Sequence, residues 1–280
     1  MLTTKITDSI KDFVRQEPRT TDDIAKKLRI SWVTADRYVQ RISDEDGSIK
    51  VKTFRGGTRG ALKLVYWNNT DKPAMSSVQD KLFQMILRGR TKYDFSPLDI
   101  YQYVDDKKRS AEVEREPHES TRMPTYLWEL LERTKTQLLI FSGNLSWSNF
   151  KLNDATFLDL IETLAKRGAS IKILTRVDLA GIDNIHRMLA INQRLGKDAI
   201  QIRHCEQPLR AFIIDDQVLR LKEIKQPRDY KPGELQAVTN IYYTITDKDW
   251  VAWMQKVFWH NYAQAVDAQT RINVLKSIKA

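Results

Sequence analysis

Hydrophobic residues recur at helical spacing in three segments near the start of the chain, which predicts helices over residues 6–17, 19–30 and 31–43. Thr20 or Thr21 can cap the second helix and Ser31 the third, because a hydroxyl there accepts hydrogen bonds from the first free backbone N–H groups. The residues expected to face the interior are Ile6, Ile10, Phe13, Val14, Ile24, Leu28, Ala35, Val39 and Ile42.

Two strand-like segments follow, joined by a glycine-rich stretch. In residues 49–53 apolar and basic positions alternate, as they do in a strand with one buried face. Residues 61–67 alternate as well, although their outward face is less polar. The intervening RGGTRG is typical of a hairpin tip, because glycine tolerates the backbone conformations of tight turns. The first 70 residues therefore predict three helices and a two-stranded hairpin.

The second half of the chain has a different pattern, in which short apolar runs alternate with amphipathic segments. Strands are expected within residues 136–147, 170–178, 199–205, 209–216, 218–224 and 237–247, and helices over residues 125–135, 156–169, 184–196 and 249–266. Alternation of this kind predicts an α/β sheet with covering helices, and an α+β fold for the chain as a whole. The last helix is rich in aromatic residues, which predicts core packing and leaves open a buried contact with a partner subunit.

The middle of the chain is expected to connect two domains. Residues 68–77 are polar and rich in turn-forming residues, and residues 75–90 have the pattern of a helix. Residues 105–124 are highly charged and poorly periodic, which predicts an exposed loop or mobile helix. The expected organisation is a first domain over 1–70, a linker and helical connector over 71–124, and a second domain over 125–280.

The charge of the chain indicates the class of partner that it binds. The net charge is +10 and the isoelectric point is about 9.5, a balance that favours an anionic partner such as nucleic acid. Residues 1–70 contain 14 Lys/Arg and 9 Asp/Glu, so a quarter of the chain carries half of the excess. A basic surface is therefore expected at the N-terminal domain.

Several classes of site and location are not expected. Cys205 is the sole cysteine, which excludes an internal disulfide and a cysteine-only zinc site. The first residues lack the apolar core of a signal peptide, and no apolar run is long enough to span a membrane. We expect a cytoplasmic, nucleoid-associated protein with no membrane partner, no cofactor and no metal site.

The order of elements in residues 1–70 resembles the winged helix-turn-helix family, and IAKKLRISWVTADRYVQRI resembles the core of that family. The resemblance implies that the third helix enters the major groove of duplex DNA. Arg37 and Gln40 suit hydrogen bonds to base edges, and Arg55 and Arg59 at the hairpin tip suit phosphate or the minor groove. The residues expected to contact DNA are Trp32, Val33, Thr34, Asp36, Arg37, Gln40, Arg41, Lys52, Arg55 and Arg59.

The layout of the second domain resembles one half of the phospholipase D superfamily, with LRAFIIDDQ at the place of its H-x-K-x-x-x-x-D signature strand. In this register Pro208 occupies the histidine position, Arg210 the lysine position and Asp215 the aspartate position. Proline offers no nucleophile, so no catalytic residue is assigned. His204 could replace it only through an irregular strand, because four residues of strand span about 13 Å. The combination with a winged helix is similar to TrmB-type transcriptional regulators.

Polar residues around this strand are the candidates for binding a small ligand. Arginine at position 210 can still hold an anion, and the polar turn SGNLSW follows a buried strand, where ligands of α/β sheets often bind. The residues expected to line this pocket are Ser142, Asn144, Arg203, Arg210 and Asp215.

The function predicted from the sequence is a DNA-binding transcriptional regulator. Its partners are double-stranded DNA, a second copy of the chain, and a small anionic ligand or a protein partner. The phospholipase D-like domain would be catalytically degenerate and would serve dimerisation or sensing. Two alternatives stay open: a phosphodiesterase or nuclease that acts on DNA, and an architectural or replication-associated DNA-binding protein.

Overall fold

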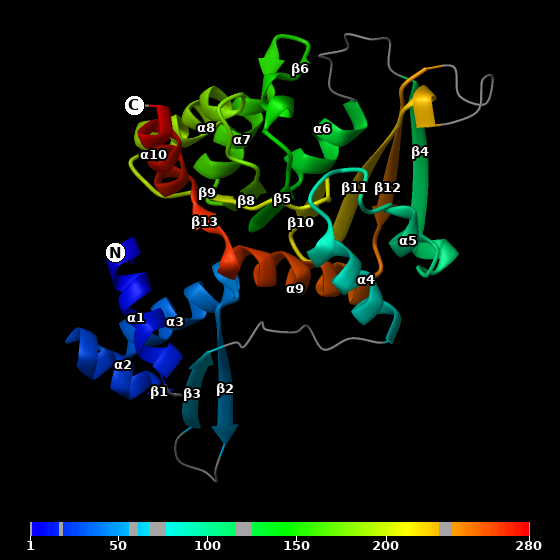
Figure 1. Ribbon diagram of the computed structural model, residues 1–280. Coiled ribbons are helices and arrows are strands. Elements are labelled where there is room, and N and C mark those ends of the chain that lie inside the picture. Colours follow the sequence, from blue (N-terminus) through cyan, green and yellow to red (C-terminus); the bar gives the residue numbers. More distant parts are fainter. Residues whose placement is uncertain are drawn as a thin grey trace. The chain divides into compact units, whose positions relative to one another are not determined.

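A computed structural model of the chain describes residues 2–16, 19–55, 61–67, 77–115, 125–229 and 237–279 (Figure 1). The chain divides into two compact units, residues 1–72 and residues 73–280.

The first unit contains the helices and the hairpin that the hydrophobic pattern predicts. Its elements are α1 (Thr4–Gln16), β1 (Arg19–Thr20), α2 (Thr21–Leu28), α3 (Trp32–Asp46), β2 (Ile49–Arg55) and β3 (Ala61–Trp67). Thr20 caps α2: its side chain accepts a hydrogen bond from the Asp23 backbone N–H, and the Asp23 carboxylate accepts one from the Thr20 N–H. Ser31 caps α3 with its side-chain oxygen, which accepts a hydrogen bond from the Thr34 backbone N–H at 3.2 Å. The two-residue strand β1 pairs with β3 and was not expected, because so short a strand has no detectable period.

The core of the first unit lies between the three helices and the hairpin. Most of the residues expected to face inward are buried there, and Leu28, Ile6 and Phe13 pack against them half-buried. Gly47 ends α3 in the left-handed conformation, at φ 62°, which turns the chain directly into β2. The fully buried members of the core are Ile10, Val14, Ile24, Ala35, Val39, Ile42, Ile49 and Val65.

The second unit is built on a mixed sheet of eight strands among the described residues, in the order β13-β9-β8-β5-β10-β11-β12-β4. Strands β5, β8 and β9 are parallel, and the other pairings are antiparallel. This confirms the predicted mixed α/β architecture. The strands are β4 (Arg109–Arg115), β5 (Gln137–Phe141), β8 (Ser170–Thr175), β9 (Ile200–His204), β10 (Ala211–Ile214), β11 (Val218–Lys225), β12 (Thr239–Ile245) and β13 (Val266–Asp267), with the small pair β6 (Lys151–Leu152) and β7 (Ala155–Thr156) outside the sheet.

Helices cover both faces of this sheet (Figure 1). One face packs against α6 (Thr125–Glu132), α7 (Phe157–Lys166), α8 (Ile182–Leu195) and α10 (Ala268–Lys279). The opposite face packs against α4 (Ser77–Arg88), α5 (Leu98–Tyr101) and α9 (Lys248–Gln264). The central strand β8 is buried along its whole length, as expected for a parallel strand covered on both sides.

Helix α9 accounts for the aromatic segment near the end of the chain. Trp253, Phe258 and Tyr262 are buried against the sheet, and Phe258 meets Phe141 edge to face at 5.1 Å between ring centroids. These rings therefore contribute to the core of their own unit. A partner subunit stays a prediction.

The predicted connector is wrong in one respect: residues 77–115 belong to the second unit. Helix α4 contributes Leu82, Phe83 and Ile86 to its core, and β4 lies within the segment expected to be a loop or mobile helix. Strand β4 is at the edge of the sheet and pairs only with β12 among the described strands. Its sequence RSAEVER is mostly charged and polar, as is common in edge strands, so it gives no apolar strand signal.

Candidate functional sites

The exposed face of α3 is the candidate nucleic-acid interface of the first unit. Trp32 and Val33 are 43% and 71% exposed although both are apolar. Arg37, Gln40 and Arg41 are exposed on the same helix, and Thr34 is half-buried beside the Ser31 cap. This face presents large apolar surface together with hydrogen-bond donors, which is the combination that reads thymine methyl groups and base edges.

Contacts within the unit fix several of these side chains. The Lys63 Nζ on β3 lies 2.7 Å from each carboxylate oxygen of Asp36 and 5.3 Å from the centre of the Trp32 ring, so β3 braces α3. Gln40 donates to Asp44 at 2.9 Å, and Arg41 donates to Glu45 at 2.5 Å. Arg37 forms no ion pair with any described residue and lies 5.9 Å from the Tyr38 ring centre. Asp36 is thus engaged by lysine, whereas Arg37 is exposed without a carboxylate partner among the described residues.

Part of the expected interface cannot be placed. Arg59 lies outside the described residues, and Lys52 and Arg55 lie on β2 with side chains that are likewise not described.

The strand register of the second unit brings basic and aromatic residues onto one face of the sheet. Lys222 donates its backbone N–H to the Arg210 carbonyl at 2.7 Å and pairs on its other side with Tyr242. Two positions along each strand, Phe212 pairs with Arg220. Because aligned residues on neighbouring strands share a face, these five side chains point to the same side.

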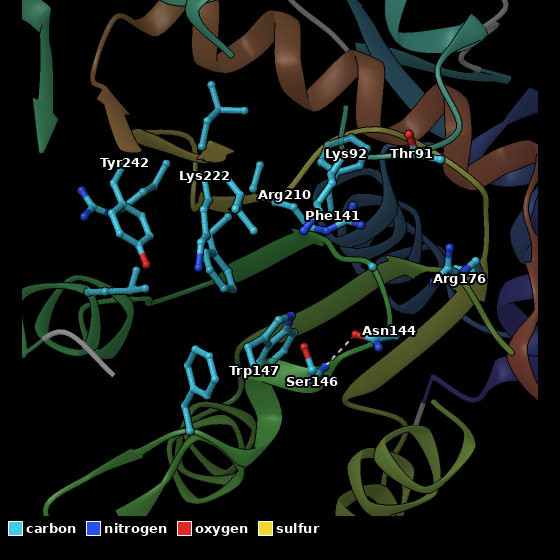
Figure 2. Close-up of a pocket in the computed structure, with 18 of the residues that line it drawn as sticks. Thr91, Lys92, Phe141, Asn144, Ser146, Trp147, Arg176, Arg210, Lys222 and Tyr242 are labelled. Atoms are coloured by element: carbon cyan, nitrogen blue, oxygen red, sulfur yellow. Dashed lines mark hydrogen bonds between the residues drawn. The ribbon is translucent and has the colours of Figure 1, made fainter. Parts of the chain in front are cut away.

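That face carries a pocket of about 520 Å³ (Figure 2). Figure 2 shows Arg210 and Lys222 across the pocket from Trp147 and Ser146. The cations that line it are Lys92, Arg176, Arg210, Arg220 and Lys222, and none of the aspartates and glutamates that the structure describes belongs to the lining. Arg176 pairs with Asp178 and Arg220 with Glu112, each at 2.9 Å, and both carboxylates lie outside the lining. The pocket is therefore electropositive and suits an anion.

The surroundings of Arg210 constrain its guanidinium and lower its pKa. Its guanidinium packs so tightly on Gly143 that a Cβ there would lie 2.6 Å from a terminal nitrogen. It donates to the Leu209 carbonyl at 2.7 Å and contacts no carboxylate among the described residues. Burial, and to a smaller extent the charge of Arg176, lower the pKa of Arg210 to about 10. A desolvated cation of this kind gains most from a bound anion.

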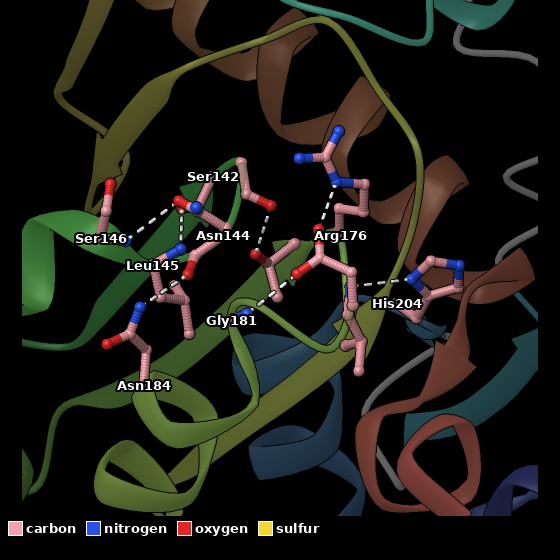
Figure 3. Close-up of polar contacts among 12 residues, drawn as sticks. Ser142, Asn144, Leu145, Ser146, Arg176, Gly181, Asn184 and His204 are labelled. Atoms are coloured by element: carbon pink, nitrogen blue, oxygen red, sulfur yellow. Dashed lines mark hydrogen bonds and ion pairs between the residues drawn. The ribbon is translucent and has the colours of Figure 1, made fainter. Parts of the chain in front are cut away.

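The SGNLSW turn forms another wall of the pocket and is held by internal hydrogen bonds (Figure 3). The Ser142 Oγ accepts hydrogen bonds from the Leu145 N–H at 3.2 Å and from the Trp147 indole N–H at 2.8 Å. The Asn144 side chain accepts from the Ser146 N–H at 3.2 Å. Asn144 and Ser146 line the pocket, whereas Ser142 braces the turn behind it.

At the positions aligned with the H-x-K-x-x-x-x-D signature, proline stands in place of the histidine. Pro208 packs on Gly89 just after α4, where an added Cβ would lie 2.7 Å from the proline ring. The His204 Nδ1 accepts a hydrogen bond from the Val177 N–H at 3.0 Å (Figure 3), and burial lowers the pKa of the His204 imidazole. His204 lies on β9, three strands from β10, which corresponds to about 14 Å at ordinary strand spacing. None of the histidines that the structure describes lines the pocket.

Arg203 and Asp215, both expected at the ligand site, lie elsewhere. Arg203 donates to the Tyr262 carbonyl at 2.8 Å and stacks on that ring at 4.4 Å. The register aligns it with Leu174, Phe141 and Ala211, so it points to the face opposite Arg210.

The Asp215 carboxylate is a structural clamp. It accepts backbone hydrogen bonds from Lys135, Thr136 and Gln137 at 2.9–3.1 Å and one from the Thr136 hydroxyl at 2.8 Å. Burial raises the pKa of this carboxyl, but the hydrogen bonds outweigh it, so the net pKa is lowered.

The sequence missed most of the pocket wall, notably Lys92, Trp147, Arg176, Lys222 and Tyr242. The alternation of VLRLKEI contained one signal, because it places Arg220 and Lys222 on the face opposite Leu219 and Leu221. No group of three or more metal-ligating side chains occurs among the described residues. No helix in the described ranges combines the length and hydrophobicity required to cross a bilayer.

No protein-family model and no curated protein sequence matches this chain. Among solved structures, it is similar to Nuc, a phospholipase D family member from Salmonella typhimurium, with a TM-score of 0.41 and 13% identity over 57% of this chain and 98% of that one. It is similar to NucT from Helicobacter pylori, with a TM-score of 0.39 and 12% identity over 57% of this chain and 99% of that one. It is also similar to TrmBL2, an archaeal chromatin protein that binds DNA, with a TM-score of 0.41 and 15% identity over 89% of this chain and 88% of that one.

Proposed function

We propose that the chain is a transcriptional regulator that binds duplex DNA through its first unit. The main support for this proposal is the face of α3 on which Trp32, Val33 and Arg37 are exposed and do not belong to the core of the unit. The Lys63–Asp36 ion pair ties β3 to the helix, which holds this face in one orientation before DNA is bound. The basic charge of residues 1–70 supports the same partner.

The second unit supplies dimerisation and binds a small anionic ligand in the pocket beside Arg210. We assign it no catalytic activity, because Pro208 takes the position of the nucleophile and His204 is engaged by a backbone N–H on a distant strand. Metal-independent cleavage of DNA that is lost in His204→Ala would restore the phosphodiesterase reading.

Replacing Arg37 with alanine is expected to weaken DNA binding about tenfold, because one base-edge contact contributes about 1–3 kcal/mol of discrimination. Binding of the unaltered protein should also fall steeply as salt is raised, since phosphate contacts release counterions. Electrophoretic shift with selected duplex DNA at several salt concentrations measures both effects.

The charge-matched control for this experiment is Arg133→Ala, which removes an exposed arginine from the second unit. Equal loss in both variants, or no binding at low salt, would contradict the proposed role of α3. Comparable affinity for random and selected DNA would instead identify an architectural protein.

The proposed dimer predicts a solution mass near twice the 32.7 kDa of one chain. Winged-helix proteins commonly read paired half-sites, so dimerisation doubles the recognised sequence. Size-exclusion chromatography with light scattering measures the mass, and a concentration-independent monomer would contradict the dimer.

A further inference from the structure

The pocket beside Arg210 combines cations with an unusually aromatic wall. Seven of its lining residues are aromatic: Tyr93, Phe141, Trp147, Phe150, Phe157, Phe212 and Tyr242. A site for inorganic phosphate alone needs donors and little apolar surface. The pocket volume of about 520 Å³ is also far larger than one phosphate needs, and lies in the range of small-molecule sites.

Trp147 is positioned in advance to contact a flat ring. Its indole N–H is held by Ser142 at 2.8 Å, and the ring packs edge to face on Phe157 and Phe212 at 4.5 and 5.8 Å. The side chain is half-buried and lines the pocket, so part of its surface stays open on that side. Figure 2 shows it across from Arg210 and Lys222.

We propose that this pocket binds a mononucleotide, with the phosphate at Arg210 and Lys222 and the base against Trp147. The inference rests on the anion site of the proposed function and names its ligand class. Arg210 offers the phosphate a desolvated guanidinium with no competing carboxylate among the described residues, and Arg176 adds charge beside it. Stacking on an aromatic ring stabilises a bound base and is tolerant of base identity. The Asn144 and Ser146 side chains at the same wall provide hydrogen-bonding groups for the sugar.

Calorimetric titration of the full-length protein with AMP, ribose 5-phosphate, adenosine and inorganic phosphate tests this assignment. AMP is expected to bind at least tenfold more tightly than each of the other three probes. Arg210→Gln should abolish AMP binding, and Trp147→Leu should reduce AMP affinity to the level of ribose 5-phosphate. Arg133→Gln, which removes an exposed arginine outside the pocket, should bind AMP as the unaltered protein does.

The outcomes separate this inference from the proposal on which it rests. Equal affinity for AMP, ribose 5-phosphate and phosphate would overturn the mononucleotide but leave an anion site and DNA binding intact. No binding of any probe would overturn both the mononucleotide and the anion site, while gel shift reports the winged-helix unit independently. If the protein binds single-stranded DNA more tightly than AMP, and Arg210→Gln loses the binding of both, the mononucleotide is overturned. The ligand of the pocket would then be the end of a DNA strand. A thermal unfolding scan of each variant identifies any that fail to fold, and Arg210→Lys then provides a milder substitution, expected to weaken AMP binding rather than abolish it.

Discussion

Glu112→Ala is expected to destabilise the second unit by about 3 kcal/mol, because it removes the carboxylate partner of a buried arginine. Arg220 is only 2% exposed. Its guanidinium donates to Glu112 on β4 at 2.9 Å and to the Thr244 hydroxyl at 2.5 Å, and it lies between the rings of Tyr126 and Tyr242. The Nε–H has no acceptor among the described residues, so the cation has no spare partner. The value belongs at the low end of the usual range since Glu112 is 45% exposed and water can reach the vacated position.

Chemical denaturation of the single and double variants measures this effect. Arg220→Met combined with Glu112→Ala should recover most of the lost stability, because methionine replaces the apolar stem of the arginine and leaves no buried charge to satisfy. Glu112→Gln, which keeps an acceptor, should fall between the unaltered protein and Glu112→Ala. If Glu112→Ala unfolds at the same denaturant concentration as the unaltered protein, the ion pair does not stabilise the sheet edge.

The first unit was predictable because its signals are local. Helical periodicity, the caps at Thr20 and Ser31 and the alternation on β2 all lie within a few residues of the structure that they specify. The pairing of β1 with β3 is not local, since it joins Arg19 to Val65. No property of a two-residue segment indicates which distant strand it will meet.

In the second unit, the local sequence pattern predicts some strands and not others. Strand β8 is buried on both faces and was found, because Ile171, Ile173 and Leu174 give it an apolar signal within six residues. Strand β4 was missed because one of its edges is open and its charged side chains hide the alternation. Glu112 on that strand is nevertheless the partner of the buried Arg220, 108 residues away in the sequence.

The pocket depends on register even more strongly. Arg210 was expected from the spacing to Asp215, and Asn144 from its place after a strand, and both predictions concern position along one segment. Arg203 was expected beside Arg210, but the register of four strands places it on the other face. Whether two residues on different strands share a face depends on pairings that a single sequence does not display.

Asp215→Asn is expected to cost about 2 kcal/mol at pH 7, because the carboxylate joins the β10–β11 turn to the start of β5. Four hydrogen bonds from Lys135, Thr136 and Gln137 converge on it, and hydrogen bonds to a charged acceptor are stronger than those to a neutral one. Asparagine keeps the shape and tolerates the left-handed backbone at this position, φ 51°. The substitution therefore tests the charge and spares the conformation.

The pH dependence follows from the lowered pKa of Asp215. A carboxyl whose folded pKa lies below its unfolded value stabilises the protein above the unfolded pKa, about 4. That contribution is lost as the pH falls through the folded pKa, when the carboxyl is protonated in both states. The difference in unfolding free energy between the unaltered protein and Asp215→Asn should therefore be constant from pH 6 to 8 and shrink below about pH 4. The neighbouring Asp216→Asn is the control, because Asp216 is exposed and its carboxylate forms no hydrogen bond or ion pair among the described residues. A difference that persists unchanged into acid would mean that shape, and not charge, makes position 215 a clamp.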